Sequence, residues 1–228
     1  MAYSVSSEQI IKEAVQAGRE LKPDTSLDER FMEAEGQATA LADYLNLLIK
    51  WNKSMNLVGP SGWEEIFHSL ITDSLYLADF LKTLDLPESP RTLDLGAGAG
   101  LPGIPLRCVW QNGSYLLVES RQKRSIFMRT VLRSIKLPGT DVFQGRAEKI
   151  PQAELPADLI ISKAFMPWKE LLPFVIPMLG KGGRVIILSN DLPPDSAATE
   201  KFGFKVEKHT TYSAGNREHY LWALKNIA

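Results

Sequence analysis

The chain has 228 residues, of which 44% are hydrophobic, and its 26 basic and 27 acidic side chains give a net charge of −1. This composition is typical of a soluble globular protein and excludes a polybasic protein that coats nucleic acid. The single cysteine, Cys108, cannot form an internal disulfide, so we expect a cytoplasmic protein. The first residues lack the pattern of a signal peptide, and no segment has the roughly 20 apolar residues of a membrane span.

Residues 1–88 are predicted to form a helical extension. Ser6 with Gln9, and Ser26 with Glu29, have the spacing of a capping box at a helix start, and apolar residues follow at three- to four-residue steps. The segment WNKSMNLVGPSG is expected to break this pattern, and IFHSLITDSLYLADFLK to resume it until LDLPESPR.

Residues 89–228 are predicted to form an α/β domain, because short β-type runs alternate with helical segments from Arg91 onward. The runs are RTLDLG, SYLLVES, TDVFQ, ADLIIS, GRVIIL, FKVEKHTTY and HYLWALK. The last two are separated by only SAGNRE, which is too short for a crossover helix, so they should pair antiparallel. We therefore expect seven strands in a Rossmann-like, mostly parallel sheet, with a ligand at the carboxyl ends of the first strands.

A glycine-rich segment follows the first of these strands. Gly98, Gly100 and Gly103 satisfy the GxGxxG pattern of dinucleotide sites, whereas Asp94 with Gly96, Gly98 and Gly100 satisfies DxGxGxG. Asp94 favours S-adenosylmethionine, whose cationic methionine end prefers a nearby carboxylate and which has no pyrophosphate to hold.

Two later segments fit a bound nucleoside. Glu119 ends the second strand, where a carboxylate binds ribose hydroxyls, and residues 145–148 (GRAE) follow the third strand, where a loop could line an adenine. Both candidate cofactors bind their ribose and adenine in this way. These two segments therefore predict a bound nucleoside and do not distinguish the two cofactors.

Several blocks resemble one family, the RsmG ribosomal small-subunit methyltransferases, also called glucose-inhibited division protein B. The blocks are LNLLIKWNKSMNLVG, HSLITDSL, LDLGAGAGLPGIPL, LLVESRQKRSIFM and GRAE, in the family's order. The resemblance implies a class I S-adenosylmethionine-dependent methyltransferase fold. It also implies methyl transfer to N7 of a guanine of 16S rRNA near the decoding region, with the small ribosomal subunit as partner.

The resemblance also assigns the cofactor-binding positions. Asp94 is expected to orient the glycine loop, and Ser162, Lys163, Ala164 stand where the family has a Ser/Ala-Arg-Ala segment, so that lysine replaces the usual arginine. The predicted cofactor-binding residues are Asp94, Gly96, Gly98, Gly100, Leu101, Glu119, Ala147, Glu148 and Lys163.

The residues agree with transfer to a ring nitrogen that needs no catalytic base. Cys108 lies among apolar neighbours, which favours a buried structural thiol over the nucleophile of C5 methylation. SKAFMPW lacks the Asn/Asp-Pro-Pro-aromatic segment of amine methylation. We expect no general base and no metal, with Lys163 as a candidate for an orienting role. His68 and Asp73 are interpreted as a structural brace, and Phe165 or Trp168 could stack on an extruded guanine.

Residues 121–136 carry six cations and no acidic residue, whereas residues 1–35 have eight acidic and four basic side chains, a net charge of −4. The predicted RNA-binding residues are Arg121, Lys123, Arg124, Arg129, Arg133 and Lys136. Two other interpretations stay open, an NAD-dependent oxidoreductase and a non-catalytic RNA- or nucleotide-binding module. A monomer is the default expectation.

Overall fold

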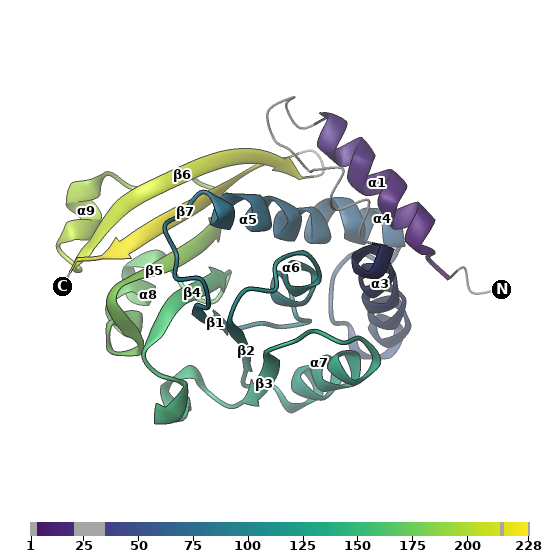
Figure 1. Ribbon diagram of the computed structural model, residues 1–228, viewed down its shortest axis with the longest axis horizontal. Coiled ribbons are helices and arrows are strands. Elements are labelled where there is room, and N and C mark those ends of the chain that lie inside the picture. Colours follow the sequence, from purple (N-terminus) through teal and green to yellow (C-terminus); the bar gives the residue numbers. More distant parts are fainter. Residues whose placement is uncertain (1–3, 21–34, 215–216, 228) are drawn as a thin grey trace.

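The fold is a seven-stranded sheet between two layers of helices, as the computed structural model shows for residues 4–20, 35–214 and 217–227 (Figure 1). The strand order is β3-β2-β1-β4-β5-β7-β6; the first five strands are parallel, and β7 is antiparallel to both of its neighbours. The strands are β1 (Arg91–Leu95), β2 (Ser114–Glu119), β3 (Thr140–Gln144), β4 (Ala157–Lys163), β5 (Leu179–Ser189), β6 (Phe204–Ala214) and β7 (Arg217–Asn226).

All seven predicted strands are confirmed, and so is the antiparallel pairing of the last two. β5 begins at Leu179, earlier than the predicted run, because Ala157 of β4 pairs with Leu179 across a register shift. The helices and short turns within this part of the chain are α6 (Gly103–Val109), α7 (Gln122–Ser134), α8 (Trp168–Val175), α9 (Ser196–Glu200) and the 3-10 turns η2 (Ala147–Lys149), η3 (Gln152–Glu154) and η4 (Ile176–Met178).

The N-terminal part is helical, as predicted, with two differences. The helices are α1 (Ser7–Glu20), α3 (Glu35–Met55), α4 (Trp63–Ile66) and α5 (Thr72–Lys82), and a π-helical turn, η1 (Phe67–Ile71), joins the last two. The Ser6 and Gln9 capping box forms, since each side chain accepts a hydrogen bond from the other residue's amide, at 2.9 and 3.2 Å. The second capping box, Ser26 with Glu29, lies outside the described residues.

The first difference is that α3 continues through Met55, into the segment expected to break it. The helix ends where Asn56 takes a positive φ of 51°, which asparagine tolerates better than most residues. The Asn52 side chain holds the turn, donating to Pro60 O and accepting from the Val58 amide. The second difference is the π turn, where the Thr72 hydroxyl donates to Phe67 O five residues back.

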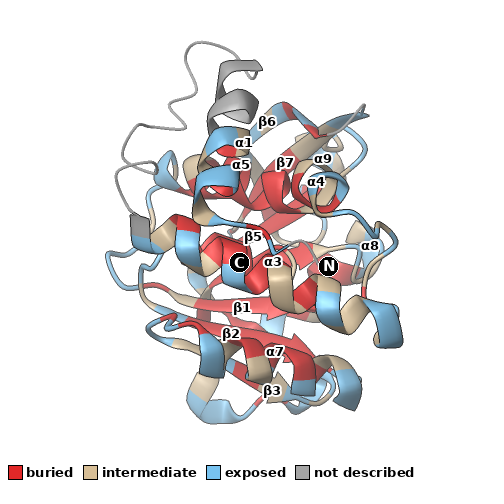
Figure 2. Ribbon diagram, turned by 90° about the vertical axis from the view of Figure 1, so that its right-hand side faces the viewer, coloured by how far each residue is buried: buried red, intermediate tan, exposed pale blue. Residues whose placement is uncertain are grey.

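Strand residues alternate between two hydrophobic cores, one on each face of the sheet. The central strands are mostly buried (Figure 2). Tyr115 and Leu117 of β2 lie in the core covered by α3, α5, α6 and α7, whereas Leu116 and Val118 lie in the core covered by α8. Because both faces are covered, the central parallel strands are almost continuously apolar.

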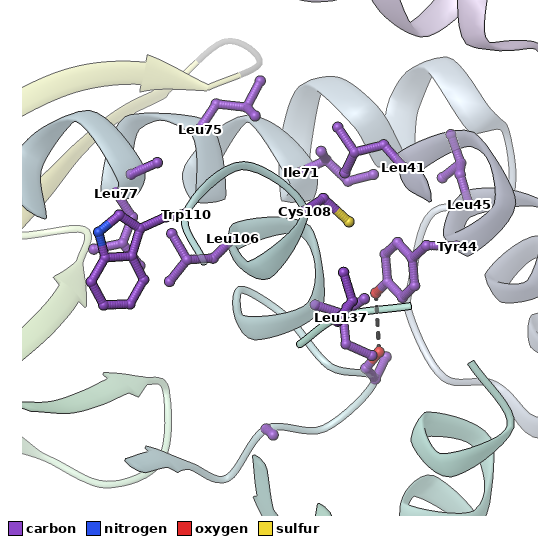
Figure 3. Packing of buried hydrophobic residues seen from close by; sticks show 14 of the residues in the cluster. Leu41, Tyr44, Leu45, Ile71, Leu75, Leu77, Leu106, Cys108, Trp110 and Leu137 are labelled. Carbon is purple, nitrogen blue, oxygen red and sulfur yellow. Dashed lines mark hydrogen bonds between the residues drawn. The ribbon is translucent and has the colours of Figure 1, made fainter. Parts of the chain in front are cut away.

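The helical extension and the α/β part share the first of these cores. Side chains of α3, η1 and α5 pack around α6, and the Cys108 thiol is fully buried among them (Figure 3). Burial raises the pKa of the Cys108 thiol, so this cysteine is structural, as predicted. The packing is continuous between the two predicted parts, and the boundary at residues 88 and 89 stays a prediction.

Arg107 of α6 is a buried cation that the sequence did not reveal. Its guanidinium donates to the carbonyl oxygens of residues 110–113 and Pro138, and to the Thr140 hydroxyl, at 2.6 to 3.2 Å. It thereby ties together the loops that enter β2 and β3.

Candidate functional site

The glycine-rich loop after β1 lies at the carboxyl edge of the sheet. The amides of Gly96 and Ala97 both donate to Val118 O of β2 at 3.0 Å, which fixes the start of the loop against the neighbouring strand. Gly96, Gly98 and Gly100 all have positive φ values, between 61° and 84°. The alternating glycines of DxGxGxG are therefore required by the path of the backbone.

Half-buried Gly98 of the loop lies beside Glu119, which ends β2 and is 6% exposed. The Gly98 amide donates to Glu119 Oε2 at 3.0 Å, and the Arg121 amide donates to Oε1 at 2.7 Å. A Cβ atom at Gly98 would meet, at 3.5 Å, only the end of the flexible Arg124 side chain and, at 3.7 Å, Gly96 O. A ligand can thus approach the backbone here, beside a carboxylate.

Asp94 lies beneath the loop. Its carboxylate is 1% exposed and accepts hydrogen bonds from the Tyr115 hydroxyl at 3.1 Å and from the Gly103 amide. Burial raises the pKa of Asp94 to about 7, although both hydrogen bonds and the charge of Lys163 act to lower it. A Cβ at Gly103 would come within 2.4 Å of Asp94 Oδ2, so glycine is needed for this approach. These contacts fit the loop-orienting role expected of Asp94.

The remaining predicted cofactor residues lie along the same edge of the sheet. The Gly145 amide donates to Glu119 O at 3.0 Å, which brings the segment with Ala147 and Glu148 next to the end of β2. Ala147 is buried and Glu148 is exposed. Leu101 is half-buried at the end of the glycine loop.

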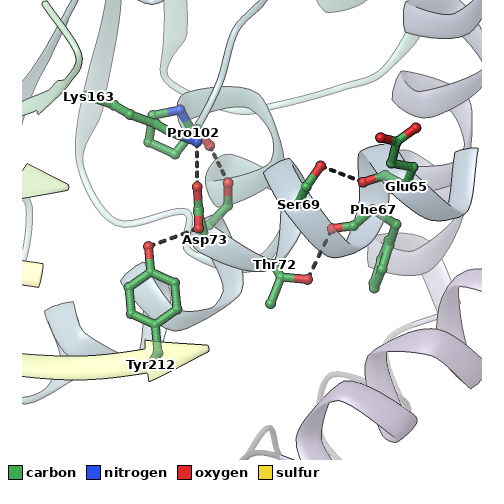
Figure 4. A network of polar contacts seen from close by, with 9 residues as sticks. Glu65, Phe67, Ser69, Thr72, Asp73, Pro102, Lys163 and Tyr212 are labelled. Atoms are coloured by element: carbon green, nitrogen blue, oxygen red, sulfur yellow. Dashed lines mark hydrogen bonds and ion pairs between the residues drawn. The ribbon is translucent and has the colours of Figure 1, made fainter. Parts of the chain in front are cut away.

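Lys163 ends β4 and forms an ion pair with Asp73 of α5 (Figure 4). Asp73 is 1% exposed, and its other carboxylate oxygen accepts from the Tyr212 hydroxyl of β6 at 2.9 Å. Asp73 therefore braces the helical extension against the sheet, as predicted. For His68 the prediction is wrong, because its side chain contacts Glu13 of α1, at 2.9 Å, within the extension itself.

An open cleft of about 630 Å³ lies beside Lys163, over the carboxyl ends of β4 and β5. Pro167 and Trp168 line it, together with residues 187–192 that end β5 and follow it. Phe165 instead packs on Gly96, whose added Cβ would lie 2.7 Å from the ring, and on Phe174, with 6.0 Å between ring centroids. Of these aromatic side chains, Trp168 is the one that lines the cleft.

Two helices of the extension contact the glycine loop, and these contacts were not predicted from the sequence. The buried Tyr44 hydroxyl of α3 donates to Ala99 O at 3.0 Å (Figure 3), and the Ser74 hydroxyl of α5 donates to Pro102 O at 3.0 Å. Ser74 and Asp73 both lie in the block HSLITDSL. The family resemblance therefore includes these residues, but it does not show what they contact.

The basic segment is mostly exposed along α7. Arg121, Lys123, Arg133 and Lys136 are exposed, and Arg124 is half-buried near Gly98. Arg129 is also exposed, but its guanidinium donates to Val142 O of β3 at 2.9 Å. One end of this segment therefore lies beside the glycine loop.

Within residues 4–20, 35–214 and 217–227, no helix is both long and apolar enough to span a membrane. In the same part of the chain, no three His, Cys, Asp or Glu side chains are grouped as metal ligands.

Comparison with solved structures supports the fold. A SAM-dependent methyltransferase from Aquifex aeolicus aligns with a TM-score of 0.53 at 18% identity, over 78% of this chain and 98% of the other. M. jannaschii TYW2, solved in complex with AdoMet, aligns with a TM-score of 0.52 at 16% identity, over 69% of this chain and 75% of the other. The fold is therefore that of the S-adenosylmethionine-dependent methyltransferases, as expected.

Comparison with sequences gives the family. A ribosomal RNA small subunit methyltransferase G from Nitratidesulfovibrio vulgaris is 51% identical over 86% of this chain and 89% of its own length. One from Lawsonia intracellularis is 43% identical over 87% of this chain and 91% of its own. Neither the oxidoreductase nor the non-catalytic alternative gains support. The family model described as rRNA small subunit methyltransferase G matches residues 37–219, and the chain belongs to this methyltransferase family.

Proposed function

We propose that this protein transfers the methyl group of S-adenosylmethionine to N7 of one guanine in 16S rRNA of the small ribosomal subunit, in the cytoplasm. The observation that carries the proposal is the open backbone at Gly98 beside the Glu119 carboxylate, in a chain of this family. The reaction, the rRNA and the modified atom are the ones that the family resemblance implies.

The residues present fit the cofactor. Glu119 would accept hydrogen bonds from the ribose hydroxyls, and the segment with Ala147 and Glu148 would line the adenine. The loop from Gly96 to Leu101 would contact the remainder through its backbone, with Asp94 orienting it from below. When bound, S-adenosylmethionine supplies an electrophilic methyl group on its sulfonium sulfur.

The chemistry at guanine N7 requires little of the protein beyond alignment. N7 has an in-plane lone pair that is essentially unprotonated at neutral pH, so it can attack the methyl carbon without a general base. Cys108 is fully buried and has a raised thiol pKa, which agrees with a reaction that uses no cysteine nucleophile. The protein would hold donor and acceptor in line and exclude water between them.

RNA would dock on the exposed face of α7 and the loop before it. Arg121, Lys123 and Arg124 lie at the end of the basic segment next to the glycine loop. Arg133 and Lys136 extend the positive charge toward the other end of α7. Such a stripe suits the phosphates of one RNA feature next to the reacting base. The expected monomer stays a prediction.

The proposal is tested by incubating the protein and labelled S-adenosylmethionine with small subunits that lack the modification. We expect label in 16S rRNA, 7-methylguanine after digestion, and a single modified position after mapping. Naked 16S rRNA in a parallel reaction shows whether assembly is required. No label in either substrate, with binding of S-adenosylmethionine intact, would favour a module that binds without catalysis.

A further inference from the structure

Two segments that lack acidic residues pack against each other at the surface. Residues 44–62 cover the second half of α3 and the connection to α4, and they contain Lys50, Lys53 and no Asp or Glu. Residues 121–136 contain the six cations at α7 and likewise no acidic residue. Both lysines are exposed, and α3 packs on α7. The positive charge of α7 therefore continues onto the helical extension.

The two helices meet at Phe127 of α7. The centroid of its ring lies 5.7 Å from that of Trp51 and 6.4 Å from that of Tyr44, both on α3. Lys123 stands four residues before Phe127, so it projects from the side of α7 that faces α3. Lys50 is the exposed neighbour of Trp51. Because packed helices lie roughly 8–10 Å apart, lysines on both of them can reach one RNA backbone. We call this line of contact the α3–α7 seam.

The seam also presents apolar surface to solvent. Ile126 precedes Phe127 and is 45% exposed. Trp51 is half-buried, with its ring packed on Phe127. Cations beside aromatic and apolar side chains are the combination that holds single-stranded RNA, because the cations bind phosphates while the apolar groups pack on bases.

One end of the seam reaches the glycine loop. The Tyr44 hydroxyl donates to Ala99 O at 3.0 Å, and Arg124 Nη1 would lie 3.5 Å from a Cβ atom at Gly98. The acidic residues of α3, at positions 35 and 43, both come before this part of the helix. A strand held along the seam would therefore run outward from the cofactor loop over a surface of one charge.

We propose that a single strand of the substrate rRNA lies along the α3–α7 seam, with Lys50 and Lys123 on its phosphates and Ile126 against a base or ribose. The inference rests on the proposed function. It extends the RNA contact from α7, where the sequence analysis places it, onto α3 of the helical extension. α3 would then support the glycine loop with its buried side and bind RNA with its exposed side.

Lys50→Ala tests the phosphate contact, through binding of the protein to unmodified small subunits at several salt concentrations. Loss of one contact to a single strand should reduce the slope of log K against log salt by about 0.7, and weaken binding about fourfold at about 0.15 M salt. kcat/KM for methylation should fall by the same factor, with kcat and the Kd for S-adenosylmethionine unchanged. Lys50→Arg should keep the wild-type values. The control is Lys12→Ala, which removes an exposed lysine of α1 and should change nothing.

Ile126→Ser tests the apolar contact. We expect binding to weaken about fivefold at every salt concentration with the slope unchanged, because an apolar contact releases no counterions. The control is Ile176→Ser, since Ile176 is also exposed, at 37%, and lies in η4 after α8. Equal weakening in both isoleucine variants would overturn the apolar part of the inference.

Other outcomes separate the seam from the proposed function. A wild-type slope and kcat/KM in Lys50→Ala would overturn the inference, and so would an equal change in Lys12→Ala, which would mean that RNA responds to overall charge. A weaker affinity of Lys50→Ala for S-adenosylmethionine would show that Lys50 acts through the glycine loop, and would also overturn it. In each of these cases wild type still methylates guanine and the proposed function stands. Wild type that transfers no methyl group to guanine would defeat the proposed function itself.

Discussion

Gly98 combines a positive φ with a backbone amide bound to Glu119, so a side chain there changes both the backbone and the charge of the site. Gly98→Asp adds a second carboxylate beside Glu119, at the surface where the cofactor would bind. We expect its Kd for S-adenosylmethionine, measured by calorimetry, to rise at least about tenfold, a loss of about 1.4 kcal/mol or more.

The matched control is Gly182→Asp, because Gly182 also has a positive φ, 71°, and an added Cβ would meet only Lys225 Cε at 3.9 Å. It carries the same backbone strain on β5, away from the glycine loop. Undiminished cofactor affinity in Gly98→Asp would show that the cofactor lies elsewhere, and an equal loss in both variants would show that the loss comes from backbone strain.

Asp94 makes stability depend on pH. Its folded pKa of about 7 lies above the ordinary 3.8, so the native state keeps a proton that the unfolded chain has already released. The stability that this retained proton contributes is fully present below pH 3.8 and is lost as the pH rises through about 7. Relative to Asp94→Asn, the free energy of unfolding of wild type should fall by on the order of 2 kcal/mol between about pH 5 and 7.

Urea unfolding of wild type and Asp94→Asn across this pH range measures the difference between their free energies of unfolding. The asparagine variant has no proton to lose, so groups common to both proteins cancel. A difference that stays constant over the whole range would show that Asp94 is ionised throughout.

Single residues also show which features of the site can be predicted from neighbouring sequence and which cannot. The position of Glu119 beside the glycine loop was predictable, because a carboxylate that ends the second strand has a fixed place relative to that loop. The contact between Lys163 and Asp73 was not predictable from spacing, since it joins residues 90 positions apart. Phe165 was a candidate for stacking on guanine, but it packs on Gly96 because the chain turns sharply at Ala164, which has a φ of 53°.

At the scale of elements, α3 and α5 serve as supports for the glycine loop, because their hydroxyls satisfy Ala99 O and Pro102 O. Tyr44→Phe removes one of these bonds and leaves a buried carbonyl without its donor. We expect a loss of about 1–2 kcal/mol in the free energy of unfolding and a severalfold weaker affinity for S-adenosylmethionine.

Tyr220→Phe on β7 is the control, since it removes a hydroxyl that donates to Glu218, and β4 and β5 separate β7 from β1 and the glycine loop. Chemical unfolding and calorimetry on both variants give the two readouts. Should Tyr44→Phe lose stability and keep its cofactor affinity, α3 would contribute packing and no support to the site.

For the whole molecule, the net charge of −1 conceals a positive face at one edge of the sheet. α7 packs beside β3, and β6 is the strand at the opposite edge (Figure 1). The double variant Arg133→Ala/Lys136→Ala should weaken binding to the small subunit. It should also reduce the slope of log K against log salt by about one for each phosphate that the protein no longer neutralises.

The control pair is Lys201→Ala/Lys205→Ala, which removes two exposed charges near the β6 edge. Binding is measured at several salt concentrations for both pairs. An equal change of slope in the two variants would mean that RNA responds to overall charge and does not dock on α7.

The sequence by itself determined the order of strands and helices along the α/β part, the glycine loop and Glu119, because these depend on periodicity and on residues close together in sequence. Only the tertiary structure decided where α3 and α5 lie. They pack on the same face of the sheet as α6, so Tyr44, Asp73 and Ser74 reach the glycine loop and Lys163 from distant positions. Such contacts arise from the burial of a shared hydrophobic core, which no local pattern encodes.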